Sequence, residues 1–376
     1  MLHHCSAEEW LEPDAGRLAC PVLRGRRRRN APPLPDQLAE ADAQYRVRRR
    51  ERLTRTRFTQ WMSNHPRCQV VMEACGSAHH WARVLGSCGH EVRLLPAQHV
   101  RAYVRRSKTD AADAAALIEA SRCEEIKPVA VKSVEQQVLQ QLHRLRTQWQ
   151  DARKARICSL RGMLREFGID IPLGATRGIA AIREALEIAD NGVPDALRPY
   201  VCEVLKEIGE LALKAKGVER SLRDLTREDP TVKRLEQIPG VGLIVATAMR
   251  AAVADIHRFP SGRHLACWLG ITAKEHSSGE RRRLGRISKQ GDVYLRTQLI
   301  HGARSALLAA KSAACKGLEL DRLRRWALET EKRVGHNKAA VALANKLARI
   351  MWATWKYDRD FNGSWKHPSA AMNKTA

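Results

Sequence analysis

The chain has 376 residues, and its 66 lysines and arginines against 41 aspartates and glutamates give a formal net charge of +25. Hydrophobic residues make up 44% and aromatic residues only 5%, which is typical of a helix-rich globular protein, long enough here for two or three domains. The sequence has no run of 18 apolar residues, so we expect no membrane-spanning segment. The excess of positive charge predicts a polyanionic partner, and nucleic acid is the first candidate.

The cysteine pattern and the first residues of the chain indicate the cellular compartment. Ten cysteines are scattered without a CxxC pair or a zinc-type Cys/His spacing, as expected for thiols in a reducing environment. The opening "MLHHCSAEEW" lacks the layout of a signal peptide. We therefore expect a cytoplasmic protein.

Residues 1–42 differ in composition and pattern from the rest of the chain. The stretch "RGRRRRNAPPLPDQ" joins an arginine block to a proline-rich segment, and neither helical nor strand periodicity appears. We predict a divergent, disordered leader over residues 1–42.

Residues 43–132 alternate between strand and helix patterns. A strand is followed by a helix that begins near Thr54, and the apolar run Gln69–Glu73 suits a buried strand. A helix closed by Gly89 and the strand "EVRLLP" complete a βαβ unit, after which "SKTDAADAAALIEASRC" forms a further helix. This order predicts an α/β domain with a parallel strand pair.

The remainder is predicted to be helical. Residues 133–227 carry apolar positions at helical spacing, which indicates a long helical hairpin, coiled-coil-like and able to pair with another copy. Breaks are expected at Pro172, Gly174, Gly192 and Pro194. We predict a helical C-terminal domain of helices and tight turns over 228–358 and a disordered tail over 359–376.

Two aspartates, Asp110 and Asp113, stand three apart at the head of an alanine run. Asp110 could simply cap the helix, where negative charge complements the helix dipole. Alternatively, the i, i+3 spacing puts both carboxylates on one helix face, where they could share Mg²⁺. Glu73, at the carboxyl end of a predicted parallel strand, is a third candidate ligand, because α/β proteins place their sites there.

The segment "IPGVG" contains Gly240 and Gly242 directly before an apolar helix. It is similar to the hairpin of helix–hairpin–helix modules, in which backbone N–H groups point at a nucleic-acid phosphate. A plain turn is the alternative interpretation.

The segment "HSSGERRRLGR" combines two serines with a group of arginines. Ser277 and Ser278 are ordinary loop residues unless a base or a strong field activates a hydroxyl. Arginines can hold a scissile phosphate and stabilise its extra charge. The candidate arginines are Arg281, Arg282, Arg283 and Arg286.

Several motifs together resemble the DEDD transposases of bacterial insertion sequences: "VVMEACGSAHHWARVL", "KTDAADAAAL", "LEQIPGVG", "HSSGERRRLGRISKQGDVYLR" and "GHNKAAVALANKLARI". The resemblance runs from about Ala43 to about Trp355. It implies an amino-terminal RNase H-like (RuvC-like) domain, which is that of Holliday-junction resolvases, and a carboxy-terminal transposase domain carrying a serine.

The resemblance also implies site residues and a reaction. Glu73, Asp110 and Asp113 correspond to the second, third and fourth acidic residues, which hold Mg²⁺. Ser278 corresponds to the nucleophile that attacks a DNA phosphodiester and forms a serine–DNA link, and Ser277 is the second choice. The expected partners are DNA at the bacterial nucleoid, a guide RNA encoded by the element, and further copies of the chain.

One part of the family pattern is missing. The first acidic residue belongs to an opening strand of the type G-[IV]-D-x-[AS]-K, and the sequence contains no such strand. A shifted reading frame or misplaced start would explain this, and we expect loss of the central strand and of one ligand to impair activity. The alternatives to an active transposase are a non-catalytic nucleic-acid-binding remnant and a junction resolvase. The long helical section and the serine segment argue against a resolvase.

Overall fold

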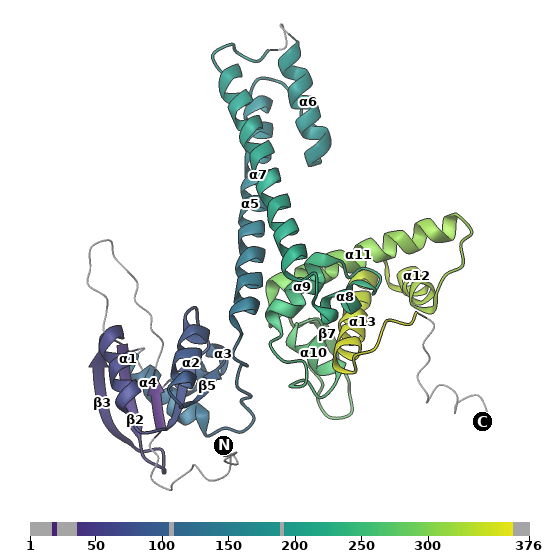
Figure 1. Cartoon of the computed structure of the whole chain (residues 1–376). Coiled ribbons are helices and arrows are strands. Elements are labelled where there is room, and N and C mark those ends of the chain that lie inside the picture. Colours follow the sequence, from purple (N-terminus) through teal and green to yellow (C-terminus); the bar gives the residue numbers. More distant parts are fainter. Residues whose placement is uncertain (1–16, 21–35, 105–108, 189–191, 364–376) are drawn as a thin grey trace, which may run out of the picture. The chain divides into compact units, whose positions relative to one another are not determined.

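The computed structural model describes residues 17–20, 36–104, 109–188 and 192–363 and divides into two compact units, Met1–Ser133 and Val134–Ala376 (Figure 1). The first unit is mixed α/β and the second is mainly helical. None of the helices in the described ranges is long and apolar enough to cross a membrane.

The first unit is built on a five-stranded mixed sheet with the order β3-β2-β1-β4-β5. The central strand β1 pairs antiparallel with β2 and parallel with β4, and β4 pairs parallel with β5. The predicted βαβ unit with its parallel pair is therefore confirmed. The strands are β1 (Arg17–Cys20), β2 (Asp36–Ala41), β3 (Val47–Leu53), β4 (Gln69–Glu73) and β5 (Glu91–Leu95).

Helices cover both faces of this sheet. Successive residues of β4 point to opposite faces, and apolar residues on each face pack against helices. Val70 packs with residues of α1 and α2, whereas the next residue, Val71, packs with α4. As the sequence predicted, α1 begins next to Thr54, which is its N-cap, and Gly89 follows the end of α2, with φ +90°. The helical elements are α1 (Arg55–Asn64), α2 (Ala78–Ser87), α3 (Ala97–Val100), a 3₁₀ turn η1 (Arg101–Tyr103) and α4 (Asp110–Ser121).

The prediction that residues 1–42 contain no strand was wrong for two segments. β1 and β2 both lie within this range, and β1 occupies the central position of the sheet. The expected loss of the central strand was therefore also wrong. A four-residue strand is too short to show a two-residue period, and its hydrogen-bond partners on both sides define it instead. The letters of β1, RLAC, contain no carboxylate.

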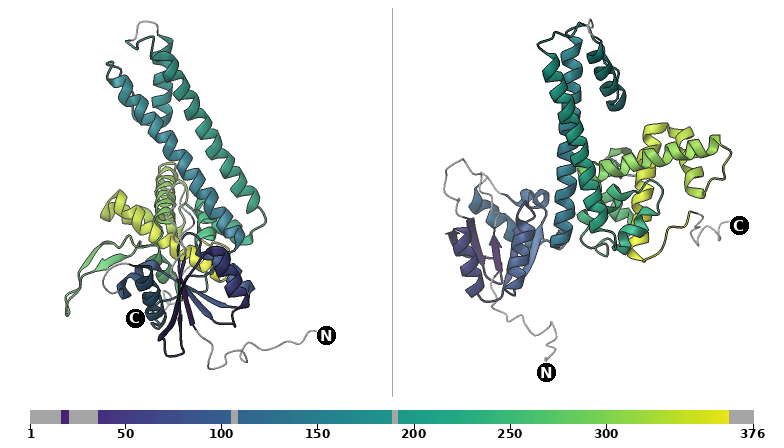
Figure 2. Two further views of the ribbon diagram at one scale, coloured as in Figure 1. Left: turned by 90° about the vertical axis from the view of Figure 1, so that its left-hand side faces the viewer. Right: turned by 45° about the horizontal axis from the view of Figure 1, so that its top comes forward.

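The second unit begins with a long antiparallel helical hairpin, shown in teal in Figures 1 and 2. It consists of α5 (Val134–Arg165) and α7 (Arg198–Leu225). Apolar residues on facing stripes pack along it, among them Leu160 and Leu205 at one end and Leu139 with Leu222 at the other. The chain between its arms forms a further helix, α6 (Ala175–Glu187), that the sequence interpretation treated as a break.

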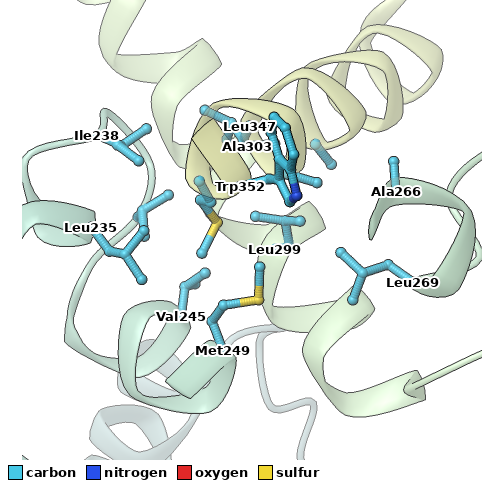
Figure 3. Packing of buried hydrophobic residues seen from close by; sticks show 14 of the residues in the cluster. Leu235, Ile238, Val245, Met249, Ala266, Leu269, Leu299, Ala303, Leu347 and Trp352 are labelled. Carbon is cyan, nitrogen blue, oxygen red and sulfur yellow. The ribbon is translucent and has the colours of Figure 1, made fainter. Parts of the chain in front are cut away.

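The rest of the second unit is a helical body around one apolar core (Figure 3). Met249, Leu299 and Leu347 meet in this core from three different helices. The helices are α8 (Pro230–Glu236), α9 (Leu243–Ala252), α10 (Gly262–Trp268), α11 (Val293–Cys315), α12 (Arg322–Val334) and α13 (His336–Lys356).

One element of this body differs from the predicted helices and turns. β6 (Ala273–Glu275) and β7 (Leu284–Ile287) form an antiparallel hairpin that extends from the helices, in green in the left view of Figure 2. The predicted tail 359–376 lies for the most part outside the described residues, which end at 363.

Candidate functional site

The half-buried Glu73 is the last residue of β4. β4 has a parallel neighbour on each side, β1 and β5. Glu73 therefore lies at the carboxyl edge of a parallel part of the sheet, which is where α/β folds assemble polar sites.

The first turn of α4 carries the two aspartates. Thr109, not Asp110, is the N-cap: its Oγ1 accepts a hydrogen bond from the backbone N–H of Ala112 at 3.2 Å. The alternative in which Asp110 caps the helix was therefore wrong, because a hydroxyl one residue earlier occupies that role. Asp113 is half-buried, and the side chain of Asp110 lies outside the described residues.

The packing of α4 fixes where its first turn lies. Ala114 and Leu117 are buried against Val71 of β4, in the same cluster as Leu95 of β5. This packing holds α4 on the strand that ends in Glu73. Glu73, Asp110 and Asp113 thus belong to β4 and to the helix that packs on it.

The donor types fit a hard divalent cation, because carboxylate oxygens are the ligands that Mg²⁺ prefers. Within the described ranges, however, no group of three or more His, Cys, Asp or Glu side chains is close enough to hold a metal ion. Two of the candidate ligands, Glu73 and Asp113, have described side chains.

The serines lie at the tip of the β6–β7 hairpin, where every residue from 273 to 286 is exposed. Ser278 and Arg281 form the last bridge before a two-residue turn. The first turn residue, Gly279, has φ +56°, the left-handed conformation that such a turn requires and that glycine adopts without strain. The turn therefore fixes the backbone on either side of Ser278.

The hairpin distinguishes the two serines. The hydroxyl of Ser277 donates to Oε1 of Glu275 at 2.7 Å and accepts from the backbone N–H of Arg283 at 3.1 Å. The hydroxyl of Ser278 has no hydrogen-bond partner among the described residues, and its side chain is exposed. Ser277 thus ties the two strands together, whereas Ser278 presents a free hydroxyl.

The arginines of the segment surround these serines. Arg282 lies 3.5 Å from the carboxylate of Glu275, in an exposed ion pair. Arg281, Arg283 and Arg286 make no ion pair within the described part of the chain. Because unpaired guanidinium groups are good partners for phosphate, the hairpin is suited to contact a polyanion.

The "IPGVG" turn connects α8 to α9, and its two glycines have different surroundings. Gly240 has φ +87°, and a Cβ there would lie 2.6 Å from the carbonyl oxygen of Gly302 on α11. Gly242, at the N-cap of α9, has open space around its Cα. Packing against α11 therefore explains why position 240 is a glycine. Gly242 is the glycine with room beside it for a binding partner such as a phosphate.

Sequence reasoning missed a polar network inside the second unit. The buried imidazole of His143 on α5 contacts the hydroxyl of Tyr294 at 2.9 Å and that of Thr247 at 3.0 Å. Burial, with a smaller contribution from Arg146, lowers the pKa of His143 to about 4, so the ring is neutral at pH 7. A single histidine in a helical pattern gives no signal of such partners.

Sequence reasoning also missed a basic face of α7. Lys216, Arg220 and Arg223 are exposed on this helix and line a groove. Their spacing of four and three residues was a usable signal, because it places all three on one side of a helix.

Comparison with known proteins covers both units. Residues 39–169 match a family model of DEDD-type IS110 transposases, and residues 232–316 match the model described as "Transposase IS116/IS110/IS902 family". A probable family 20 transposase of Pseudomonas aeruginosa is 41% identical over 308 residues, which are 81% of this chain and 88% of the relative. The transposase for insertion sequence element IS1111A of Coxiella burnetii is 38% identical over 288 residues, 76% of each chain. That for IS1328 of Yersinia enterocolitica is 33% identical over 307 residues, 81% of this chain and 88% of the relative.

Likeness of this extent places the chain among the transposases, enzymes that recombine DNA. The chain belongs to the IS116/IS110/IS902 family and is the transposase of an insertion sequence. Its partner is accordingly DNA, as its charge predicted.

Proposed function

We propose that this transposase cuts and joins DNA through the hydroxyl of Ser278. The observation that carries the proposal is the difference between the two serines: the hydroxyl of Ser277 is used within the hairpin, and that of Ser278 is not. In the proposed step, Ser278 Oγ forms a bond to a DNA phosphorus, the bond from that phosphorus to a sugar oxygen breaks, and the proton of the hydroxyl ends on the released sugar oxygen.

The neighbouring arginines support this chemistry. The transition state of such a displacement carries additional negative charge on the phosphate oxygens, and fixed cations near them lower its energy. Arg281 directly follows the turn after Ser278, and Arg283 lies two residues further on; neither has a described acidic partner. Their role in the proposal is to bind and orient the scissile phosphate.

The first unit would supply the metal-dependent part of the reaction. Its strand order and its two antiparallel strands beside a parallel group support the RNase H-like interpretation, with Glu73, Asp110 and Asp113 as ligands of Mg²⁺. When bound, such a cation stabilises charge on phosphate oxygens. Carboxylates placed on β4 and on the helix that packs on it would bind and orient that cation.

The serine assignment is tested by comparing Ser278→Ala with Ser277→Ala in a recombination assay on DNA from the element's ends. We expect Ser278→Ala to abolish both product and protein–DNA adduct. Ser277→Ala should keep adduct formation and lose activity by about an order of magnitude or less, because it removes hydrogen bonds worth about 1 kcal/mol. The reverse result would assign the nucleophile to Ser277.

The metal assignment is tested by Mg²⁺ titration of the same reaction. Asp110→Ala and Asp113→Ala should shift the Mg²⁺ requirement upward or remove activity. Glu124→Ala, which removes an exposed carboxylate beyond the end of α4, is the matched control. An unchanged Mg²⁺ response in both aspartate variants would contradict the assignment.

One observation favours a second candidate function, a non-catalytic nucleic-acid-binding remnant. The central strand β1 reads RLAC and has no carboxylate to serve as the first acidic residue. For this candidate, the unaltered chain binds DNA but forms no covalent adduct at any Mg²⁺ concentration.

We also propose a second copy of the chain as a partner. Val134, Val138 and Leu145 on α5 are 55%, 41% and 40% exposed, and their spacing places them on one face of the helix. An exposed apolar stripe on a long helix supports coiled-coil pairing, which light scattering of the purified chain would measure. The net charge of +25 also suits binding of a guide RNA.

A further inference from the structure

The second unit contains a groove of about 700 Å³ outside the serine hairpin. Three segments distant in sequence line it: α7, the turn into α9, and α11. α7 contributes Lys216, Arg220 and Arg223, α11 contributes His301, and the start of α9 contributes Gly242 and Leu243.

The charge of this groove is almost entirely positive. Glu219, the one acidic residue among the described residues that line it, accepts a 2.7 Å hydrogen bond from Nε of Arg146, whose positive charge offsets that of the carboxylate. Lys216, Arg220 and Arg223 form no ion pair with any described residue. Three neighbouring cations without acidic partners repel each other unless an external anion lies between them.

The spacing of the three cations suits an extended anion. With a rise of 1.5 Å per residue, Lys216 to Arg223 covers roughly 10 Å along α7. Both intervals, four and three residues, keep the side chains on one face of the helix. A row of charges on this scale matches several phosphates of a strand better than a single small anion.

The start of α9 adds backbone donors to the lining of the groove. Gly242 caps this ten-residue helix without a side-chain hydrogen bond, and no Cβ narrows the space beside it. The N–H groups of the first turn have no carbonyl partner within the helix, and the helix dipole favours negative charge there. The close approach of Gly240 to Gly302 holds this turn against α11.

We infer that this groove binds the phosphodiester backbone of DNA, with Lys216, Arg220 and Arg223 pairing with successive phosphates and the start of α9 receiving one of them. The inference rests on the proposed function in taking DNA as the ligand. It adds a binding surface separate from the arginines of the hairpin, and it gives one arm of the long hairpin a direct role in holding DNA.

The test is the salt dependence of DNA binding by the full chain. The variant Lys216→Gln/Arg220→Gln/Arg223→Gln removes the three groove cations and is compared with wild type on one labelled DNA duplex between 50 and 200 mM salt. Each phosphate contact contributes about 0.9 to the slope of log K against log salt, so the slope should become shallower by about 2.7. Over this range, wild-type affinity should fall about 40-fold more than that of the variant.

A matched variant separates the groove from net charge. Arg183→Gln/Lys206→Gln/Lys214→Gln removes the same charge from exposed positions of the same unit that do not line the groove. This control should keep the wild-type slope. Equal slopes for wild type and groove variant, or an equal decrease in both variants, would overturn the inference.

Two further results remain distinguishable. If wild type binds no DNA, the proposed function fails and with it the ligand assumed here. If the groove variant keeps its DNA affinity but loses binding to single-stranded RNA of the same sequence, the groove is an RNA site and the DNA assignment is overturned. Melting temperatures of both variants within 2 °C of wild type, about 1 kcal/mol for a unit of this size, establish that folding is unchanged.

Discussion

The contact between the α8–α9 turn and α11 gives a sharp stability prediction. A Cβ added at Gly302 would lie 2.0 Å from the carbonyl oxygen of Gly240. This is more than 1 Å shorter than a carbon–oxygen contact allows. Because the obstructing atom belongs to the backbone, no side-chain rotation relieves the clash, and the turn must move away from α11.

The magnitude follows from two opposing effects of Gly302→Ala. Alanine in a helix interior stabilises by about 0.5–1 kcal/mol relative to glycine. Overpacking of a closed contact costs about 1–3 kcal/mol, and a rigid backbone obstacle places this case at the upper end. The net expectation is a loss of about 2 kcal/mol, or a melting temperature roughly 4–8 °C lower for a unit of this size.

A matched control is available on α7. Gly209 is also helical, and a Cβ there meets nothing within 4 Å. Gly209→Ala should therefore stabilise the protein by the propensity term alone, about 0.5–1 kcal/mol. Thermal unfolding followed by circular dichroism measures both variants. Gly302→Ala at least as stable as Gly209→Ala would refute the close contact.

Two further predictions concern polar groups of the second unit. The pKa of His143 is about 4 in the folded chain and near 6.5 when unfolded, so the unfolded state binds the proton more readily between these values. The free energy of unfolding should therefore fall by roughly 3 kcal/mol as pH decreases from 6.5 to 4, and urea unfolding of His143→Gln should lack this component. Asp229 accepts two backbone hydrogen bonds at the start of α8 and one from Arg250. Asp229→Ala should lower stability by about 1–2 kcal/mol, against less than 0.5 for the exposed Asp224→Ala; equal urea midpoints would contradict the cap.

Much of the first unit could be predicted from local pattern. The apolar run of β4, the helix start near Thr54 and the glycine after α2 are signals carried by neighbouring residues, and each prediction was confirmed. β1 was not predicted, because a four-residue strand is defined by its partners β2 and β4, which pair with it on either side. A pairing partner distant in sequence leaves no local period.

In the candidate site, too, some features could be predicted from neighbouring residues and others depended on the folded structure. Residue type alone placed Asp110 and Asp113 in the first turn of a helix, and α4 begins there. The identity of its cap, Thr109, depended on which of two adjacent polar side chains reaches the N–H of Ala112. Sequence patterns do not resolve a difference of one residue of this kind.

The sequence by itself determined the family, the positive charge, the helical hairpin and the residue types available for chemistry, because these depend on composition and on short-range periodicity. Only the tertiary structure decided that Ser277 is held between strands while Ser278 is free, that Gly240 packs on Gly302, and that α7 lines a basic groove. Each of these depends on a contact or close approach between segments whose separation along the chain leaves no repeating pattern.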